Sequence, residues 1–267
     1  MHKSPFLETA LAAARAGEEV IRRYWQQNVA VEIKADMTPV TVADVETEHA
    51  IKAVIQAAFP EHGFFGEETG KTNPDAEYTW LVDPIDGTKS FVREYPFFST
   101  QIALMKGDTF ILGVSNAPVF GEIAWAERGG GAFWQDKPVR ASEIATLPAA
   151  TLSVGNIKTL AGEARGWGGL SDIIRTVNRT RGYGDFYHYH LLARGSIDLV
   201  IESDVNILDV AALSVIVREA GGVFTDIEGK PLTLDSTTVL AAATPELHRI
   251  VLERLGRAGE EGYALDL

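Results

Sequence analysis

The 267-residue sequence contains no cysteine. This absence excludes disulfide bonds, thiolate zinc sites and cysteine nucleophiles, and it favours a reducing compartment. Basic residues are also scarce, with 24 lysines and arginines against 37 aspartates and glutamates. They form no cluster, which argues against a nucleic-acid partner. The sequence shows neither a signal-peptide pattern nor an apolar run long enough to cross a membrane, so we expect a cytoplasmic protein without a membrane partner.

Helical and strand-like patterns cover most of the chain. Periodic apolar positions predict helices over residues 5–27, 41–59, 187–194, 209–220 and 245–255. Residues 98–140 instead resemble a meander of short strands separated by turns, and short strands alternate with helices after them. A layered α/β fold is therefore expected, with residues 1–140 and 141–267 as two halves that share one core.

Acidic residues stand where strands end or helices begin, the usual location of functional groups in α/β sheets. The segment WLVDPIDGTKSF, Trp80 to Phe91, ends an apolar run on two aspartates that flank Pro84 and Ile85. The other acids placed in this way are Asp44, Glu67, Glu68 and Asp209. Oxygen ligands without histidine or cysteine select Mg²⁺, Mn²⁺ or Ca²⁺ over zinc. The pattern indicates a site for hard divalent cations.

Each of these acids also has an ordinary structural explanation. Asp-Pro and Asp-Gly pairs are common in turns, Asp209 suits a helix N-cap, and Asp44 suits the first turn of a helix. His188 and His190 lie two residues apart on a predicted helix and so point to different faces, which makes them poor partners for one metal. The metal hypothesis rests on the conjunction of the acids and on no single one of them.

Taken together, these segments resemble the inositol monophosphatase family. The matching stretches are TVADVETE, GEE, WLVDPIDGTKSF and DVAALSVIVREAGG, in the family's order and at its separations. The resemblance extends from the first predicted helix to the last. It implies an α/β/α/β/α sandwich of the inositol monophosphatase and fructose bisphosphatase type, usually a homodimer. It also implies Mg²⁺-dependent hydrolysis of a small phosphomonoester, by attack of a metal-activated water in line on phosphorus.

The resemblance also implies which residues hold the metal ions. Glu67, Asp83 and the carbonyl of Ile85 would hold a first ion, and Asp83, Asp86 and Asp209 a second. Two or three Mg²⁺ ions per subunit are expected, with Mn²⁺ as an alternative.

Further roles follow from the same resemblance. A third, weaker ion would lean on Glu67, with Asp44 close by. Thr88 and Asp44 would orient and deprotonate the attacking water, and the backbone amides of Gly87 and Thr88 would bind the phosphate oxygens.

The substrate is the remaining question. Inositol phosphatases usually carry tryptophan and histidine where this chain has Leu208 and Asn206. The stretch RGYGDFYHYH and the segment DGTKSFVRE resemble the histidinol-phosphatase branch, which acts in histidine biosynthesis. We expect Asp185, Glu202 and Asn206 to read the substrate's cationic part. An inositol-1-monophosphatase or broad-specificity phosphatase is the alternative, and an inactive metal-binding interaction protein is a distant third.

Overall fold

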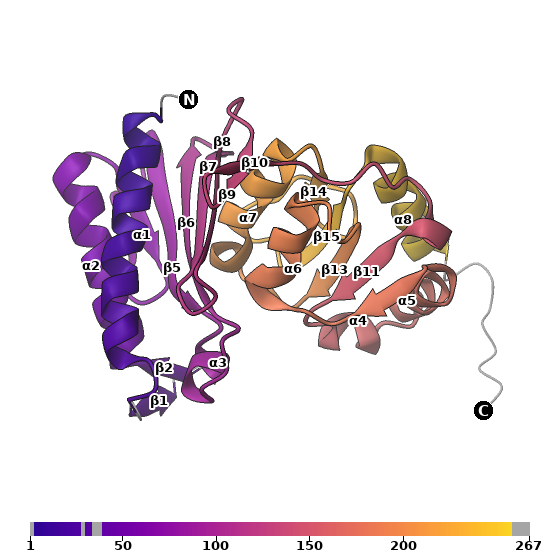
Figure 1. Ribbon diagram of the computed structural model, residues 1–267, viewed down its shortest axis with the longest axis horizontal. Coiled ribbons are helices and arrows are strands. Elements are labelled where there is room, and N and C mark those ends of the chain that lie inside the picture. Colours follow the sequence, from indigo (N-terminus) through magenta and orange to yellow (C-terminus); the bar gives the residue numbers. More distant parts are fainter. Residues whose placement is uncertain (1–2, 28–29, 34–38, 258–267) are drawn as a thin grey trace. The chain divides into compact units, whose positions relative to one another are not determined.

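The computed structural model describes residues 3–27, 30–33 and 39–257 (Figure 1). Backbone contacts divide the chain into two compact units. The first unit comprises Met1–Pro138 and Leu208–Glu219, and the second comprises Val139–Ile207 and Ala220–Leu267. The sequence-based division after residue 140 lies near the first boundary, but the segment that carries Asp209 groups with the first unit and not with the second half.

The first unit is built on an eight-stranded sheet with the order β10-β9-β8-β7-β6-β5-β3-β4. Its strands are β3 (Gly63–Gly66), β4 (Gly70–Thr72), β5 (Tyr78–Asp86), β6 (Ser99–Lys106), β7 (Thr109–Ala117), β8 (Glu122–Glu127), β9 (Ala132–Trp134) and β10 (Lys137–Val139). A separate pair is formed by β1 (Val31–Ile33) and β2 (Pro39–Thr41). The run from β6 to β10 corresponds to the meander that the sequence predicts.

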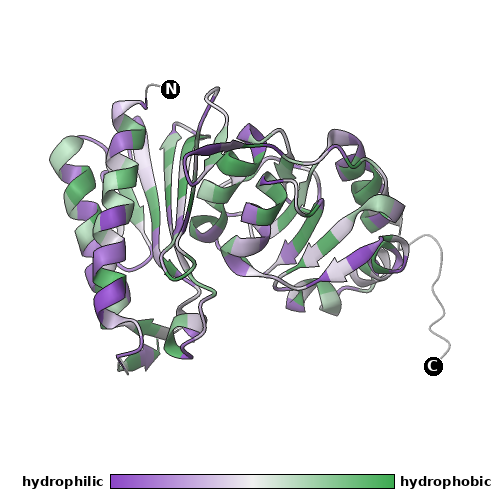
Figure 2. Ribbon diagram, viewed as in Figure 1, coloured by the Kyte–Doolittle hydropathy of each residue, from purple (hydrophilic) through white to green (hydrophobic). Residues whose placement is uncertain are grey.

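Helices pack on both faces of this sheet. The helices α1 (Pro5–Tyr24) and α2 (Val42–Ala58) bury their apolar sides against one face, around the fully buried Trp80. Hydrophobic and hydrophilic residues alternate around α1 in Figure 2, as expected of a helix with one buried side. The helix α7 (Ile207–Glu219) packs on the other face, where a Cβ at Gly113 would lie 2.2 Å from the carbonyl oxygen of Ala212.

The second unit is a five-stranded sheet with the order β12-β11-β13-β15-β14. Its strands are β11 (Thr151–Val154), β12 (Arg179–Arg181), β13 (Leu199–Ser203), β14 (Val223–Thr225) and β15 (Thr238–Ala242). One face packs on α4 (Lys158–Gly162), α5 (Ala164–Thr176) and α8 (Pro245–Arg257), and the other on α6 (Asp185–Ala193). A short 3₁₀ helix (Leu147–Ala149) precedes β11. Both units thus confirm the predicted layering of helices and sheets.

None of the helices in the described part of the chain is both long and apolar enough to span a membrane.

Candidate metal centre

The strand β5 carries the site because its pairing with β6 is irregular. Asp83 pairs with Gln101 and Asp86 with Ser99, so three steps along β5 match two along β6. Side chains alternate between faces of a regular strand, and residues three apart would point to opposite faces. The extra residue of this bulge reverses that alternation, and both aspartates can face the same side. The bulge contains Pro84, which has no N–H to contribute to the sheet.

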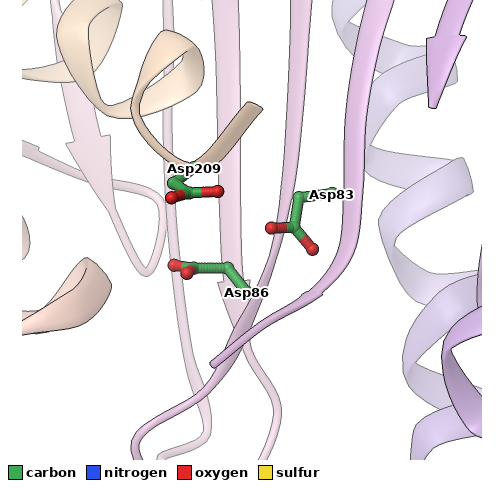
Figure 3. Close-up of side chains that lie close together, drawn as sticks. All are labelled: Asp83, Asp86 and Asp209. Carbon is green, nitrogen blue, oxygen red and sulfur yellow. The ribbon is translucent and has the colours of Figure 1, made fainter. Parts of the chain in front are cut away.

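A third carboxylate joins the two aspartates from α7. Asp83, Asp86 and Asp209 each offer one oxygen atom, and these atoms lie within 4.8 Å of one another. Their side chains point toward one another in Figure 3. Asp209 lies in the first turn of α7, where the positive end of the helix dipole favours a negative charge. These three residues are the set that the family resemblance implies for the second ion.

The remaining acids lie close enough to act on this triad. Glu67 directly follows β3, which pairs in parallel with β5, so both strands end at the same edge. Burial raises the pKa of Asp83 well above its usual value, and the charges of Glu67, Asp86, Asp209 and Asp44 raise it further. Burial also raises the pKa of Asp44, despite the hydrogen bonds that it accepts. The negative charges of four neighbouring carboxylates thus act on Asp83.

A divalent cation fits this arrangement. Asp83 is 3% exposed, and its Oδ1 atom has no hydrogen-bond partner among the described residues. A buried carboxylate oxygen without a donor is costly unless a cation compensates it. All donors of the triad are carboxylate oxygens, the ligand type that Mg²⁺ and Mn²⁺ prefer. Magnesium-type chemistry therefore suits the donor set.

A hydroxyl and a carboxylate lie paired beside the triad. The Oγ1 atom of Thr88 lies 3.0 Å from Oδ1 of Asp44 and 3.1 Å from the carbonyl oxygen of Ile85. The other oxygen of Asp44 accepts hydrogen bonds of 2.7 Å from both the amide and the hydroxyl of Thr41, the N-cap of α2. Asp44 is thus both a capping residue, as its ordinary explanation holds, and a partner of Thr88.

The turn after β5 requires glycine. Gly87 has a φ of 96° and is the N-cap of the short helix α3 (Thr88–Val92). A Cβ at this position would also lie 2.6 Å from the carbonyl oxygen of Phe97. The Ile85 side chain is fully buried in an apolar cluster, which anchors the backbone between the two aspartates.

The predicted substrate-reading residues lie in the second unit. Asp185 begins α6 with a φ of 46°, in the left-handed region that non-glycine residues seldom occupy. Its carboxylate forms no hydrogen bond with the described residues. Burial, then the charge of Glu202, raises its pKa to about 6, although His188 acts to lower it. Residues held in such sparsely populated backbone conformations cluster at functional sites. Asn206 is exposed, just before α7.

Glu202, in contrast, is engaged inside the second unit. Its Oε1 accepts a hydrogen bond of 3.1 Å from the amide of Asn156, and its Oε2 accepts one of 2.7 Å from the hydroxyl of Tyr189. Nε2 of His188 lies 3.2 Å from the same Oε2. Burial acts to raise the pKa of Glu202, but His188 and these hydrogen bonds together lower it. These contacts hold the Glu202 carboxylate in place inside the second unit.

Sequence reasoning missed one buried acid near the centre. Glu48 on α2 is fully buried, and its carboxylate contacts the loop that follows β3. It lies one helical turn after Asp44, so both side chains share one side of the helix. A second acid at this spacing on a helix face expected to be buried was the available signal.

Comparisons with known proteins are consistent with this geometry. The model of the family described as "Inositol monophosphatase family" matches residues 2–260. The histidinol-phosphatase of Mycobacterium tuberculosis is 38% identical over 257 residues, which cover 93% of this chain and 97% of the relative. The inositol-1-monophosphatase of Mesorhizobium japonicum is 32% identical over 250 residues, which cover 90% and 92%.

A solved structure matches the whole fold. The extragenic suppressor protein suhB from Bartonella henselae superposes with a TM-score of 0.86 at 30% sequence identity. The match covers 97% of this chain and 100% of that protein.

Proposed function

Since the chain belongs to the inositol monophosphatase family, a family of phosphatases, we propose that it is a Mg²⁺-dependent histidinol-phosphate phosphatase. The triad of Asp83, Asp86 and Asp209 carries the proposal, because one oxygen atom of each lies within 4.8 Å of the others and the buried Oδ1 of Asp83 has no donor among the described residues. The substrate assignment is supported by the 38% identity to a histidinol-phosphatase along nearly the full length.

The metal ligands are proposed as two sets that share one residue. Glu67, Asp83 and the carbonyl of Ile85 form one set, and Asp83, Asp86 and Asp209 form the other. A third ion, held more weakly, would lie near Glu67 and Asp44. When bound, such ions lower the pKa of a coordinated water and neutralise charge on a phosphate.

Thr88 and Asp44 provide the proton acceptor. The Thr88 hydroxyl has one hydrogen, and donating it to Asp44 at 3.0 Å leaves its oxygen able to accept a hydrogen bond from the attacking water. Because the pKa of Asp44 is raised by burial, this carboxylate accepts a proton more readily than an exposed aspartate. We assign to the pair the orientation and deprotonation of that water.

The turn at Gly87 positions the phosphate. Its left-handed backbone begins α3, and the amides of Gly87 and Thr88 are proposed to donate hydrogen bonds to the phosphate oxygens. A side chain at position 87 would strike the carbonyl of Phe97, so the backbone itself is the only group available there.

Asp185 is proposed as the reader of the substrate's ammonium group. A carboxylate with a pKa of about 6 is ionised at neutral pH, and the Asp185 carboxylate accepts no hydrogen bond from the described residues. An ammonium ion would complete it with a charge-assisted hydrogen bond. Asn206 would contribute an amide, and Glu202 would contribute a second carboxylate.

A second candidate function is hydrolysis of inositol 1-phosphate, favoured by the 32% identity to an inositol-1-monophosphatase. The two are separated by measuring kcat/KM for histidinol phosphate, inositol 1-phosphate, fructose 1,6-bisphosphate and phosphoadenosine phosphate with the same preparation in Mg²⁺. We expect histidinol phosphate to be preferred. A preference for inositol 1-phosphate would contradict the substrate assignment but leave the phosphatase intact. The homodimer, the cytoplasmic location and the role in histidine biosynthesis stay predictions.

A further inference from the structure

Three polar residues follow one another along one side of α2. Asp44, Glu48 and Lys52 are spaced four residues apart, and such residues lie above one another on a helix. Asp44 meets Thr88, as described above. Lys52 donates a hydrogen bond of 3.1 Å to the hydroxyl of Thr69. Thus α2 contacts both the turn after β5 and the loop after β3.

Glu48 holds the backbone of that loop with both carboxylate oxygens. Its Oε2 accepts a hydrogen bond of 2.8 Å from the amide of Glu68, and its Oε1 accepts one of 2.7 Å from the amide of Thr69. Glu48 is fully buried, so water does not compete for these bonds. Hydrogen bonds to an ionised acceptor are roughly twice as strong as neutral ones.

The backbone on the other side of Glu67 is fixed as well. A Cβ at Gly66 would lie 2.5 Å from the carboxylate of Glu48, so the chain passes directly against this group. The amide of Glu67 donates a hydrogen bond of 3.2 Å to the carbonyl of Val82 on β5. Glu67 is therefore held between Gly66, packed against Glu48, and two amides bound by the same carboxylate.

We propose that Glu48 is a positioning residue, which aims the carboxylate of Glu67 at the metal centre by clamping the backbone on both sides of it. The inference rests on the proposed function in one respect, because it takes Glu67 as a metal ligand. Residues that orient metal ligands typically change metal affinity or activity ~10–100-fold when replaced.

The substitution Glu48→Gln tests the clamp. Glutamine keeps the size but presents an NH₂ group to one of the two amides, which then lacks an acceptor. In hydrogen-exchange mass spectrometry on the metal-free chain, we expect faster exchange in the peptide containing Glu68 and Thr69. We also expect Mn²⁺ affinity, measured by electron paramagnetic resonance of the free ion, to fall ~10–100-fold. The KM for Mg²⁺ should rise by a similar factor, with a smaller change in kcat at saturating Mg²⁺.

A matched control comes from Glu219 in the same unit. Its two oxygens accept hydrogen bonds of 3.0 and 2.8 Å from the amides of Gly129 and Gly131, in the loop between β8 and β9. Glu219→Gln makes the same chemical change at a loop without a metal ligand. It should leave Mn²⁺ affinity unchanged.

A second variant displaces the Glu48 carboxylate without removing its charge. It also serves as the test if Glu48→Gln does not fold. Gly66→Ala keeps the Glu48 charge but places a methyl group against its carboxylate, and it should also weaken Mn²⁺ binding. Its control is Gly162→Ala, where a Cβ meets nothing within 4 Å.

The outcomes distinguish this inference from the proposed function. Mn²⁺ binding that is weakened by Glu67→Gln, Glu48→Gln and Gly66→Ala, but by neither control, supports the clamp. Wild-type affinity in folded Glu48→Gln, or in Gly66→Ala when Glu48→Gln is unfolded, overturns it while leaving the metal centre in place. If wild type binds no Mn²⁺, or if Glu67→Gln binds Mn²⁺ as wild type does, the assignment of Glu67 as a metal ligand is wrong. Both the proposed function and the Glu48 inference depend on that assignment.

Discussion

Each unit of the molecule contains a cluster of buried acids, and the two clusters are balanced differently. In the second unit, Glu202 is surrounded by His188, the Tyr189 hydroxyl and a backbone amide. In the first unit, the pKa of Asp83 is raised by burial and then by four neighbouring carboxylates, and its Oδ1 finds no donor in the part of the chain that the structure describes. Glu202 has its partners within the fold, whereas we propose that a cation completes the surroundings of Asp83.

The two pKa shifts have opposite signs, and the sign says which charge state the fold favours. Lowering of the pKa of Glu202 means that the fold stabilises its charged form. Raising of the pKa of Asp83 means that the fold without metal opposes the charged form. A buried carboxylate whose pKa is raised by folding, and which lies among other carboxylates, is a candidate for binding a cation.

The largest effect is expected from Asp86→Asn in the metal triad. Removing one ligand charge should lower kcat by about 10³-fold or more, because a bound ion supplies several kcal/mol of charge stabilisation. In EDTA the same variant should melt at a higher temperature than wild type, because repulsion among the carboxylates is relieved. Turnover at ordinary Mg²⁺ measures the first effect, and thermal melts in EDTA measure the second. Turnover close to that of wild type would contradict the assignment of two ions.

Thr88→Ala tests the proton acceptor beside the triad. General-base assistance is worth ~10²–10⁴ in rate, and we expect a kcat loss of about 10²–10³-fold with little change in KM. Thr88→Ser keeps the hydroxyl and should restore part of the rate. Single-turnover kinetics on both variants measure the effect, and an unchanged kcat in Thr88→Ala would leave Thr88 as a structural residue of the turn.

Glu202→Gln probes the balanced cluster and should have the opposite effect on stability from Asp86→Asn. Glutamine leaves one of the buried donors to Glu202 without an acceptor, which costs about 1–3 kcal/mol, so the free energy of unfolding should fall with or without metal. The folded pKa of Glu202 is lowered, so its contribution is present above the unfolded pKa and is lost as pH falls through the folded pKa. Urea denaturation of wild type and variant between pH 7 and acid pH should show the difference shrinking. A variant as stable as wild type at pH 7 would show that Glu202 does not stabilise the fold.

Asp185→Asn is expected to have the smallest effect on phosphate-ester hydrolysis itself. It should impair hydrolysis only of a substrate that carries a cationic group. A charge-assisted hydrogen bond is worth roughly 1.5–3 kcal/mol, so kcat/KM for histidinol phosphate should fall about 10–100-fold. p-Nitrophenyl phosphate, which has no cation, should be hydrolysed as before. Equal losses for both substrates would indicate that Asp185 only supports the start of α6.

The Asp185 carboxylate should also make the stability of the protein depend on pH. Its pKa is about 6 in the folded chain, above the ordinary value of 3.8, so the folded state binds its proton more tightly. Stability should therefore fall as pH rises from about 4 to 6, by at most about 3 kcal/mol. Asp185→Asn should abolish this component, which urea denaturation across that range measures. A decline of the same size in the variant would assign it to other groups.

Much of the site could be predicted because its residues lie on short, strongly patterned segments. The apolar run into Asp83 predicts a buried strand that ends on carboxylates, and the period of residues 41–59 places Asp44 early in a helix. The bulge between Asp83 and Asp86 was not predicted, since it depends on pairing with β6. The sequence suggests a turn from Asp83 onward, whereas β5 continues through Asp86.

Tertiary packing explains two features that the sequence analysis did not predict, the helix α5 and the grouping of Asp209 with the first unit. The helix α5 has three glycines, which lower helix propensity. One of them, Gly169, allows close approach of α8, because a Cβ there would lie 2.8 Å from the Cα of Leu255. The grouping of Asp209 with the first unit likewise depends on α7 packing over Gly113, a contact between residues far apart in the chain.

Titration of Mg²⁺ into metal-free protein in a calorimeter, with the melting temperature followed in parallel, tests the central claim most directly. If the first unit's acids are a metal centre, wild type should bind two or three ions per chain and melt at a higher temperature as they bind. Asp86→Asn should lose binding and stabilisation, whereas folded Glu202→Gln should retain both. No heat and no shift in wild type, or identical titrations of wild type and Asp86→Asn, would contradict the claim.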